Sequence, residues 1–162
     1  MELVVGGMFL LPAVYALTPW LEFADYRLPS WAGLLGVAVF TGALWLFWRS
    51  HTDLGRNFSP TLQVRADHTL VVSGVCRHVR HPMYGAQWLW GIAQALLVHN
   101  WVAGFSGLAL SVLLYLLRVP REERMMTEHF GDRYRSYIDQ TGRILPRPRR
   151  TADSCSQGTE PR

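Results

Sequence analysis

Four apolar runs constrain the fold more than any other feature of this sequence. They cover residues 3–21, 31–48, 83–98 and 101–117, and none of them contains Asp, Glu, Lys or Arg. A helix of about 20 apolar residues crosses the ~30 Å hydrocarbon core of a bilayer. Because a backbone in lipid must satisfy its own hydrogen bonds, such runs are expected to be helical. The sequence therefore predicts an all-α integral membrane bundle with about four transmembrane helices.

The charged residues gather between and after these runs, in residues 49–80 and 118–150. All 16 basic residues are arginine, which excludes chemistry that depends on a catalytic lysine. Arginine-rich segments beside membrane spans favour the cytoplasmic side. We therefore expect both polar segments and both termini to face the cytoplasm. The net charge of +4 is interpreted as contact with a membrane surface rather than with nucleic acid.

The polar segment after the second run contains the turn-forming residues Gly55, Pro60 and Gly74. Residues 61–65 and 67–73 are expected to be extended. Proline is tolerated in the first turn of a helix, so Pro82 is expected to begin a helix and to place His81 where the loop meets the membrane.

Residues 118–140 show helical periodicity, and Pro120 is expected either to start a new helix there or to kink the preceding one. The predicted organisation is an N-terminal transmembrane hairpin in residues 1–49, a membrane-embedded catalytic region in 50–146, and a disordered tail in 147–162.

Arg118 and Glu122 are the first candidates for chemistry, because residues four apart share a helix face. Arg118 follows an apolar run directly, at a position where charge is costly and is often functional. The alternative is a solvated run of charges beside the membrane. Neither the spacing of His78 and His81 nor the two cysteines, Cys76 and Cys155, matches a metal site, and no metal is expected.

A catalytic triad of Ser73, His81 and Asp67 can be drawn, but no nucleophile elbow surrounds Ser73. The segment before the third apolar run nevertheless gathers groups able to hold a polar ligand. It includes Arg80-His81-Pro82-Met83-Tyr84, which lies on the side of the membrane where Arg118 is expected.

Several motifs together resemble the isoprenylcysteine carboxyl methyltransferase family, and the related phospholipid methyltransferases share part of the pattern. They are His68-Thr-Leu-Val71, Ser73-Gly74, Arg80-His-Pro-Met-Tyr84, Arg118, Glu122-Glu123, Phe130-Gly131, Tyr134, Tyr137 and Leu145-Pro146. The resemblance runs from about residue 54 to residue 146. One departure is clear, because Cys76 stands where the family usually has tyrosine.

The resemblance implies that S-adenosylmethionine binds in a cytoplasm-facing pocket formed by the polar loop, the third span and the Glu122–Glu123 helix. It also implies that Arg118 binds the carboxylate of the acceptor and that Glu122 binds the ammonium group of the cofactor. These two are the candidate catalytic residues. The implied cofactor-binding residues are Gln63, His68, Thr69, Leu70, Val71, Cys76, His81, Pro82, Met83, Tyr84 and Glu122.

The expected function is therefore methyl transfer at the membrane to a lipophilic acceptor, with a carboxylate as in S-isoprenylcysteine O-methylation expected first. A methyl sulfonium is already activated, so the enzyme chiefly needs proximity and a site that excludes water. Three alternatives remain at this point. They are methylation of a lipid amine or small thiol, a sterol-reductase-like enzyme that uses NADPH, and a membrane scaffold without enzymatic activity.

Overall fold

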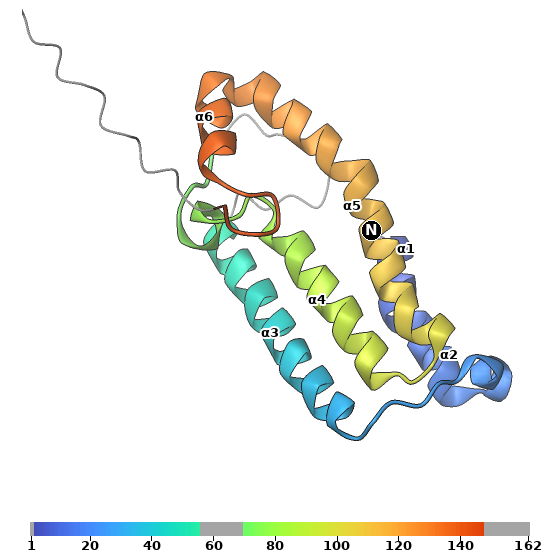
Figure 1. The fold of residues 1–162 in the computed structure, drawn as a ribbon. Helices are drawn as coiled ribbons and strands as arrows, with labels where there is room; N and C mark the ends of the chain where they lie inside the picture. The colour runs from blue at the N-terminus through green and yellow to red at the C-terminus, as the bar shows by residue number, and fades with distance from the viewer. Residues whose placement is uncertain (1, 56–69, 148–162) are drawn as a thin grey trace, which may run out of the picture.

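The computed structural model describes residues 2–55 and 70–147 of the chain. Three long helices form its body: α3 (Trp31–Leu54), α4 (Pro82–Leu97) and α5 (Trp101–Phe130). Helix α4 packs against both α3 and α5, and the N-terminal helical segment packs on α5 (Figure 1). Short 3₁₀ turns, η2 (Pro19–Ala24) and η4 (Gly74–Arg77), lie in the connections. The described residues contain no β-strand, so the prediction of an all-α fold is confirmed for them.

The first apolar run forms a helix that is shorter and less regular than predicted. It consists of α1 (Glu2–Val5), the π-helical turn η1 (Gly6–Leu10) and α2 (Leu11–Leu17), and the linking residues Val5 and Leu11 keep helical dihedrals. The carbonyl of Gly7 in the π turn accepts hydrogen bonds from Gln94 Nε2 at 2.9 Å and Ser106 Oγ at 2.8 Å. Side chains of α4 and α5 thus bond a main-chain oxygen of the π turn, which joins this helix to the bundle.

Helix α3 extends six residues beyond the predicted apolar run and takes in the start of the polar segment. The ion pair between Arg49 and Asp53 at 3.2 Å joins residues four apart, as helix-stabilising pairs do. The helix ends at Gly55, whose φ of 48° favours glycine. Asp53 Oδ2 also accepts a hydrogen bond from the backbone N–H of Val75 at 2.8 Å, so the end of α3 is tied to η4.

Helices α4 and α5 form the predicted tight antiparallel hairpin. Asn100 caps α5, because its side-chain oxygen accepts from the N–H groups of Val102 at 3.0 Å and Ala103 at 2.9 Å. Gly91 faces the backbone of Leu108 so closely that an added Cβ would lie 2.6 Å from its Cα. Small residues therefore let these two helices approach closely, as expected for helices packed in a membrane.

Helix α5 continues without interruption through Pro120 to Phe130, so Pro120 does not start a new helix. The prediction of one helix over 118–140 is wrong in its boundary: Gly131, with φ of 54°, separates α5 from α6 (Asp132–Gln140). Glycine adopts this conformation without steric cost, and the chain turns back there. Helix α6 consequently lies near the residues that precede α4 (Figure 1).

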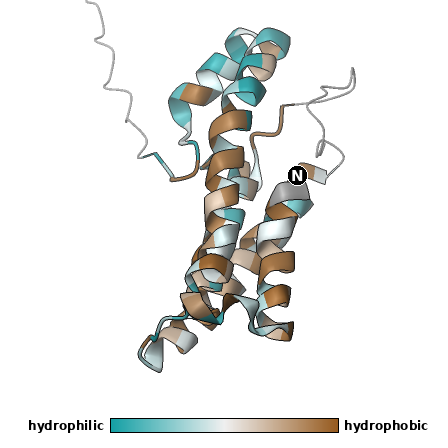
Figure 2. Cartoon of the chain, turned by 90° about the vertical axis from the view of Figure 1, so that its right-hand side faces the viewer, coloured by the Kyte–Doolittle hydropathy of each residue, from teal (hydrophilic) through white to brown (hydrophobic). Residues whose placement is uncertain are grey.

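Within the described residues, the helices long and apolar enough to cross a membrane are α3 and α5. Large apolar side chains such as Leu34 and Trp45 of α3 and Leu116 of α5 are exposed. Figure 2 shows hydrophobic residues along the long helices and hydrophilic residues gathered over α6 and the adjoining end of α5. The segment predicted as extended at 61–65, most of the segment at 67–73, and the predicted tail from 148 lie outside the described residues.

The close contact at Gly91 predicts that Gly91→Ala destabilises the fold. The added methyl group meets backbone atoms of α5, so the helices must separate, at a cost of about 1–3 kcal/mol. Thermal unfolding in detergent measures this as a lower midpoint. The matched control is Gly42→Ala in α3, where an added Cβ meets nothing within 4 Å. The unfolding midpoint of this variant should be unchanged or slightly raised. Equal midpoints for both variants would contradict the packing described here.

Candidate active site

The candidate site forms where the N-terminus of α4 meets α5 and the loop of residues 141–145, called here the C-terminal loop. His81 precedes Pro82, the first residue of α4, as predicted. The backbone N–H groups of Arg80 and His81 donate to the carbonyls of Gly142 and Arg143, each at 2.8 Å. The C-terminal loop is thereby held along the residues that lead into α4.

Glu122 lies at the centre of the predicted residues. Its Oε1 accepts from Arg118 Nε at 2.6 Å and from the hydroxyl of Tyr84 at 3.0 Å. Its Oε2 lies 3.8 Å from His81 Nδ1, which is longer than a hydrogen bond. Arg118 and Glu122 therefore share a helix face, as their spacing predicts, and they contact each other directly.

Glu123 makes more ionic contacts than Glu122, although its place in the sequence indicated no role of its own. Its Oε1 lies 3.2 Å from Arg80 Nε, 3.4 Å from His81 Nε2 and 3.2 Å from Arg143 Nε. Its Oε2 accepts from Arg143 Nη2 at 2.6 Å. The two adjacent glutamates thus bind different partners and have the ring of His81 between them.

Arg80 connects Glu123 to the end of α6. Its Nη1 donates to the carbonyl of Ile138 at 2.9 Å and to the carbonyl of Thr141. Cations near a helix C-terminus satisfy carbonyls that have no partner in the helix. Arg80 was part of the motif that suggested the family, but nothing in its spacing indicated that it caps a helix 58 residues later in the chain.

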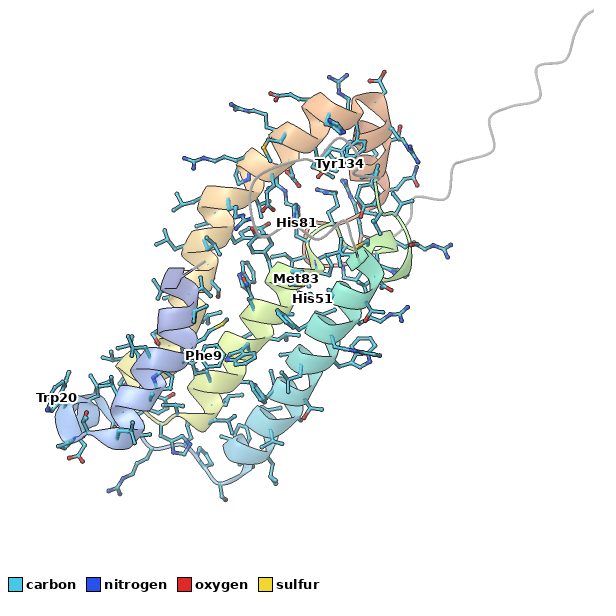
Figure 3. All side chains as sticks on the ribbon, turned by 180° about the vertical axis from the view of Figure 1, so that it is seen from behind. Phe9, Trp20, His51, His81, Met83 and Tyr134 are labelled. Carbon is cyan, nitrogen blue, oxygen red and sulfur yellow. The ribbon has the colours of Figure 1, made fainter. Side chains whose placement is uncertain are left out.

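A series of edge-to-face aromatic contacts leads from the ionic groups into the apolar bundle. The ring centroids are 5.8 Å apart for His81 and Tyr84, 5.7 Å for Tyr84 and Tyr115, and 5.1 Å for Trp88 and Tyr115. Aromatic pairs of this geometry are stabilising and bury large apolar areas. Figure 3 shows His81 and Tyr134 at the end of the molecule enclosed by α5, α6 and the loop before α4. The ionic groups therefore border an apolar interior.

The remaining predicted cofactor residues are distributed around this region. Pro82 is buried and Met83 partly exposed in the first turn of α4. Leu70 is buried and Val71 partly exposed, and Leu70 lines a hollow of about 290 Å³ with seven other residues. These are Val72, Arg77, Arg133, Ser136, Tyr137, Gln140 and Thr141. The other three predicted residues, Gln63, His68 and Thr69, lie outside the described residues.

Cys76 lies in η4 and is 2% exposed. Its carbonyl accepts a hydrogen bond from the hydroxyl of Tyr137 on α6. Burial, with a smaller contribution from Asp53, raises the pKa of the Cys76 thiol to about 11. Burial also raises the pKa of Tyr134, to about 12, with the Glu123 carboxylate as the next cause. Both groups are therefore uncharged at neutral pH and serve packing and hydrogen bonding rather than nucleophilic attack.

Within the described segments, no group of three or more His, Cys, Asp and Glu residues could hold a metal ion. Both ring nitrogens of His81 face carboxylates, at 3.8 Å from Glu122 and 3.4 Å from Glu123. Ser73, the serine of the triad considered from the sequence, is exposed, and Asp67 lies outside the described residues. The geometry of His81 therefore favours a role in the ionic cluster over a role as a base.

A family model described as the isoprenylcysteine carboxyl methyltransferase family matches residues 34–128, more than half of the chain. The chain belongs to the isoprenylcysteine carboxyl methyltransferase family. The matched segment includes most of α3, all of α4 and the part of α5 that carries Arg118, Glu122 and Glu123. The suspected resemblance is thus confirmed.

Relatives in the family are named as enzymes. The chain is 30% identical to protein-S-isoprenylcysteine O-methyltransferase of Homo sapiens over 143 residues, which is 82% of this chain and 50% of the relative. It is 28% identical to the enzyme of the same name from Tribolium castaneum over 142 residues, again 82% of this chain and 50% of the relative. The chain therefore spans about half the length of these relatives.

A solved structure shares the fold. The eukaryotic intramembrane Ras methyltransferase, isoprenylcysteine carboxyl methyltransferase, superposes with a TM-score of 0.68 at 24% identity. The match covers 90% of this chain and 51% of the solved chain. The described part of the chain thus has the fold of an intramembrane protein.

The burial and raised pKa of Cys76 predict that its thiol resists alkylation in the folded protein. With a pKa of about 11, roughly one thiol in a thousand is ionised at pH 8. The measurement uses iodoacetamide on the Cys155→Ser variant, with mass spectrometry of the peptide that contains Cys76. Labelling should be very slow in detergent and fast after unfolding in guanidinium at the same pH. Equal rates would show that Cys76 is accessible.

Proposed function

We propose that this chain is an S-adenosylmethionine-dependent methyltransferase that acts at the membrane on the carboxylate of a lipophilic acceptor. By analogy with its named relatives, the acceptor is a protein C-terminal S-isoprenylcysteine. The observation that carries the proposal is the placement of Glu122. It is a partly buried carboxylate with a side chain 22% exposed, in contact with Arg118 and Tyr84 and bordering an apolar interior.

The residues around Glu122 suit the amino acid end of the cofactor. Glu122 Oε1 is already held by Arg118 and Tyr84, which fixes the carboxylate, while Oε2 is left for a cationic ammonium group. Hydrogen bonds between charged groups are shorter and stronger than neutral ones. His81 and Tyr84 provide a polar edge and an aromatic ring beside it. The site can therefore hold a molecule that has both charged and aromatic parts.

The charge of the cluster favours an anionic acceptor over an amine. Among the described residues of the cluster, three arginines, Arg80, Arg118 and Arg143, face two glutamates, Glu122 and Glu123, so arginines outnumber carboxylates by one. A cation near the apolar boundary attracts an anion and repels another cation. Arginine additionally offers a planar fork that matches the two oxygens of a carboxylate.

When bound, S-adenosylmethionine supplies an activated methyl group: an acceptor carboxylate oxygen bonds to the methyl carbon, and the electron pair of the broken C–S bond stays on sulfur. The chain's own groups orient the reactants, Glu122 at the ammonium end and Arg118 at the acceptor. Both opposite charges disappear as an ester and a thioether form, so an apolar surrounding favours the reaction. The aromatic series of Tyr84, Tyr115 and Trp88 excludes water from this boundary.

The membrane arrangement we propose has four crossing segments: the N-terminal helix, α3, α4 and α5. Helix α4 has 16 residues, which span about 24 Å at 1.5 Å per residue, so its ends lie close to the membrane surfaces. The arginine-rich residues of the C-terminal loop, the last part of α5 and α6 then lie on the cytoplasmic side. The active site faces the cytoplasm, and residues 50–146 form the catalytic region behind an N-terminal hairpin.

The family match does not favour the alternatives considered from the sequence. A sterol-reductase-like enzyme would bind NADPH, and a scaffold would bind neither cofactor. Isothermal titration of the detergent-solubilised protein with S-adenosylhomocysteine and with NADPH separates the three functions. Binding of NADPH alone, or of neither compound, would contradict the proposal.

The roles of Glu122 and Arg118 predict separable defects. Glu122→Gln should weaken S-adenosylhomocysteine binding by about tenfold or more, because a charge-assisted hydrogen bond is worth about 1.5–3 kcal/mol. Arg118→Ala should change that affinity by less than about threefold, since Tyr84 still holds Glu122, yet it should abolish methylation of a farnesylcysteine acceptor. Arg118→Lys should restore activity only in part, because a point charge does not reproduce the guanidinium fork.

Arg121→Ala is the matched control for these variants. Arg121 is exposed on α5 three residues after Arg118, and its removal should leave cofactor affinity and turnover unchanged. If Arg118→Ala lost cofactor affinity as strongly as Glu122→Gln, the division of roles would be wrong. If Arg118→Ala kept full activity, the acceptor group would not be a carboxylate.

A further inference from the structure

We propose that Glu123 is the positioning residue of the cofactor site, and that it acts through His81 and through Arg143 of the C-terminal loop. The inference rests on the proposed function and adds to it two residues that neither the resemblance nor the family relationship assigns. Glu123 touches no reacting atom in this scheme. It fixes the parts of the chain that place Glu122.

Both oxygens of Glu123 already bind side chains of the protein. Oε1 lies within 3.4 Å of side-chain nitrogens of Arg80, His81 and Arg143, and Oε2 accepts from Arg143 Nη2 at 2.6 Å. Its side chain is 12% exposed, compared with 22% for Glu122. A carboxylate this buried is stable only when cations and hydrogen bonds compensate for the lost water. Glu122, with Oε2 beyond hydrogen-bond distance of His81, is the glutamate that can accept a new partner.

These three partners come from segments that Glu123 brings together. Arg80 and His81 precede α4, and Arg80 also caps the last carbonyls of α6. Arg143 belongs to the C-terminal loop, which pairs through its backbone with Arg80 and His81. One carboxylate on α5 therefore links the beginning of α4, the end of α6 and the C-terminal loop.

His81 transmits this arrangement to Glu122. Its ring lies between the two glutamates, with Nε2 at 3.4 Å from Glu123 and Nδ1 at 3.8 Å from Glu122. The same ring contacts Tyr84, which donates to Glu122 Oε1. Removing the charge of Glu123 therefore releases the ring of His81 and, with it, one wall of the site around Glu122.

Arg143 provides the second part of the test because its main side-chain contact with the site is with Glu123, alongside a weaker one with Tyr115. Its side chain is 53% exposed, but two of its nitrogens bind the two oxygens of Glu123. Bidentate pairs of arginine and carboxylate have a fixed geometry, which a single contact lacks. If Arg143 acts only by fixing Glu123, its removal should matter little once Glu123 has lost its charge.

The experiment is a double-mutant cycle of Glu123→Gln and Arg143→Met in the full chain, solubilised in detergent and titrated with S-adenosylhomocysteine. Glu123→Gln should weaken binding about tenfold and Arg143→Met about threefold, while the double variant should bind about as weakly as Glu123→Gln alone. In steady-state methylation, both changes should raise the KM for S-adenosylmethionine and leave the KM for the farnesylcysteine acceptor unchanged.

Matched controls separate positioning from folding. Glu128→Gln and Arg121→Met alter exposed charges on the same helix and should leave both KM values unchanged. If Glu123 had a purely structural role, Glu123→Gln would lower the unfolding midpoint and the folded fraction. The apparent kcat would then fall while the KM for the cofactor stayed unchanged, and that result would overturn the proposal. Independent losses that multiply in the double variant would show that Arg143 acts on the site without Glu123, and they would also overturn the proposal.

The outcomes distinguish this inference from the proposed function. If the wild-type chain binds no S-adenosylhomocysteine, the proposed function fails and the inference fails with it. Suppose instead that the wild type binds S-adenosylhomocysteine, that Glu122→Gln does not bind it, and that Glu123→Gln binds it normally. In that case only the inference is wrong. Should Glu123→Gln fail to fold, Arg143→Met decides alone: a raised cofactor KM compared with Arg121→Met supports the proposal, and an unchanged one contradicts it.

Discussion

The site depends on one constraint: two carboxylates buried beside an apolar bundle need positive charges and hydrogen bonds around them. Glu122 and Glu123 follow an apolar stretch of α5, where an unpaired charge would be strongly unfavourable. Arg80, Arg118 and Arg143 supply the opposite charge from three parts of the chain, and the ring of His81 lies between the two carboxylates. The need to neutralise two adjacent carboxylates therefore fixes how the loop before α4 and the C-terminal loop fold onto α5.

Close helix packing makes that compensation possible. Gly91 brings α4 against the backbone of α5, and the edge-to-face contacts of Tyr115 with Tyr84 and Trp88 continue the same interface toward the ionic cluster. The 3.0 Å hydrogen bond from Tyr84 to Glu122 lies at the end of this interface. Van der Waals packing of small residues, which drives helix association in membranes, thus sets the distance between the two helices that form the site.

The sequence predicted the helical class, the positions of α3 to α5 and the shared helix face of Arg118 and Glu122, because helical spacing and apolar length are local properties. It missed the division at Gly131, which depends on a single positive φ value. It also missed the roles of Glu123, Arg80 and Arg143. Their partners lie 20 to 61 residues away in sequence, and long-range pairing of charges leaves no periodic signal. The spans expected at 3–21 and 83–98 form helices, but their crossing of a membrane stays a proposal.

The site also extends beyond the part of the chain that the family match covers. That match ends at residue 128, whereas Arg143 and the backbone of Gly142 contact Glu123 and Arg80. Gly142 has little freedom to change, because an added Cβ would lie 1.7 Å from the carbonyl oxygen of Leu145. The C-terminal loop is thus constrained both by its own tight turn and by ionic contacts to α5. Since the same carboxylate binds this loop and the histidine beside Glu122, a displacement of the loop must also change the position of His81 relative to Glu122.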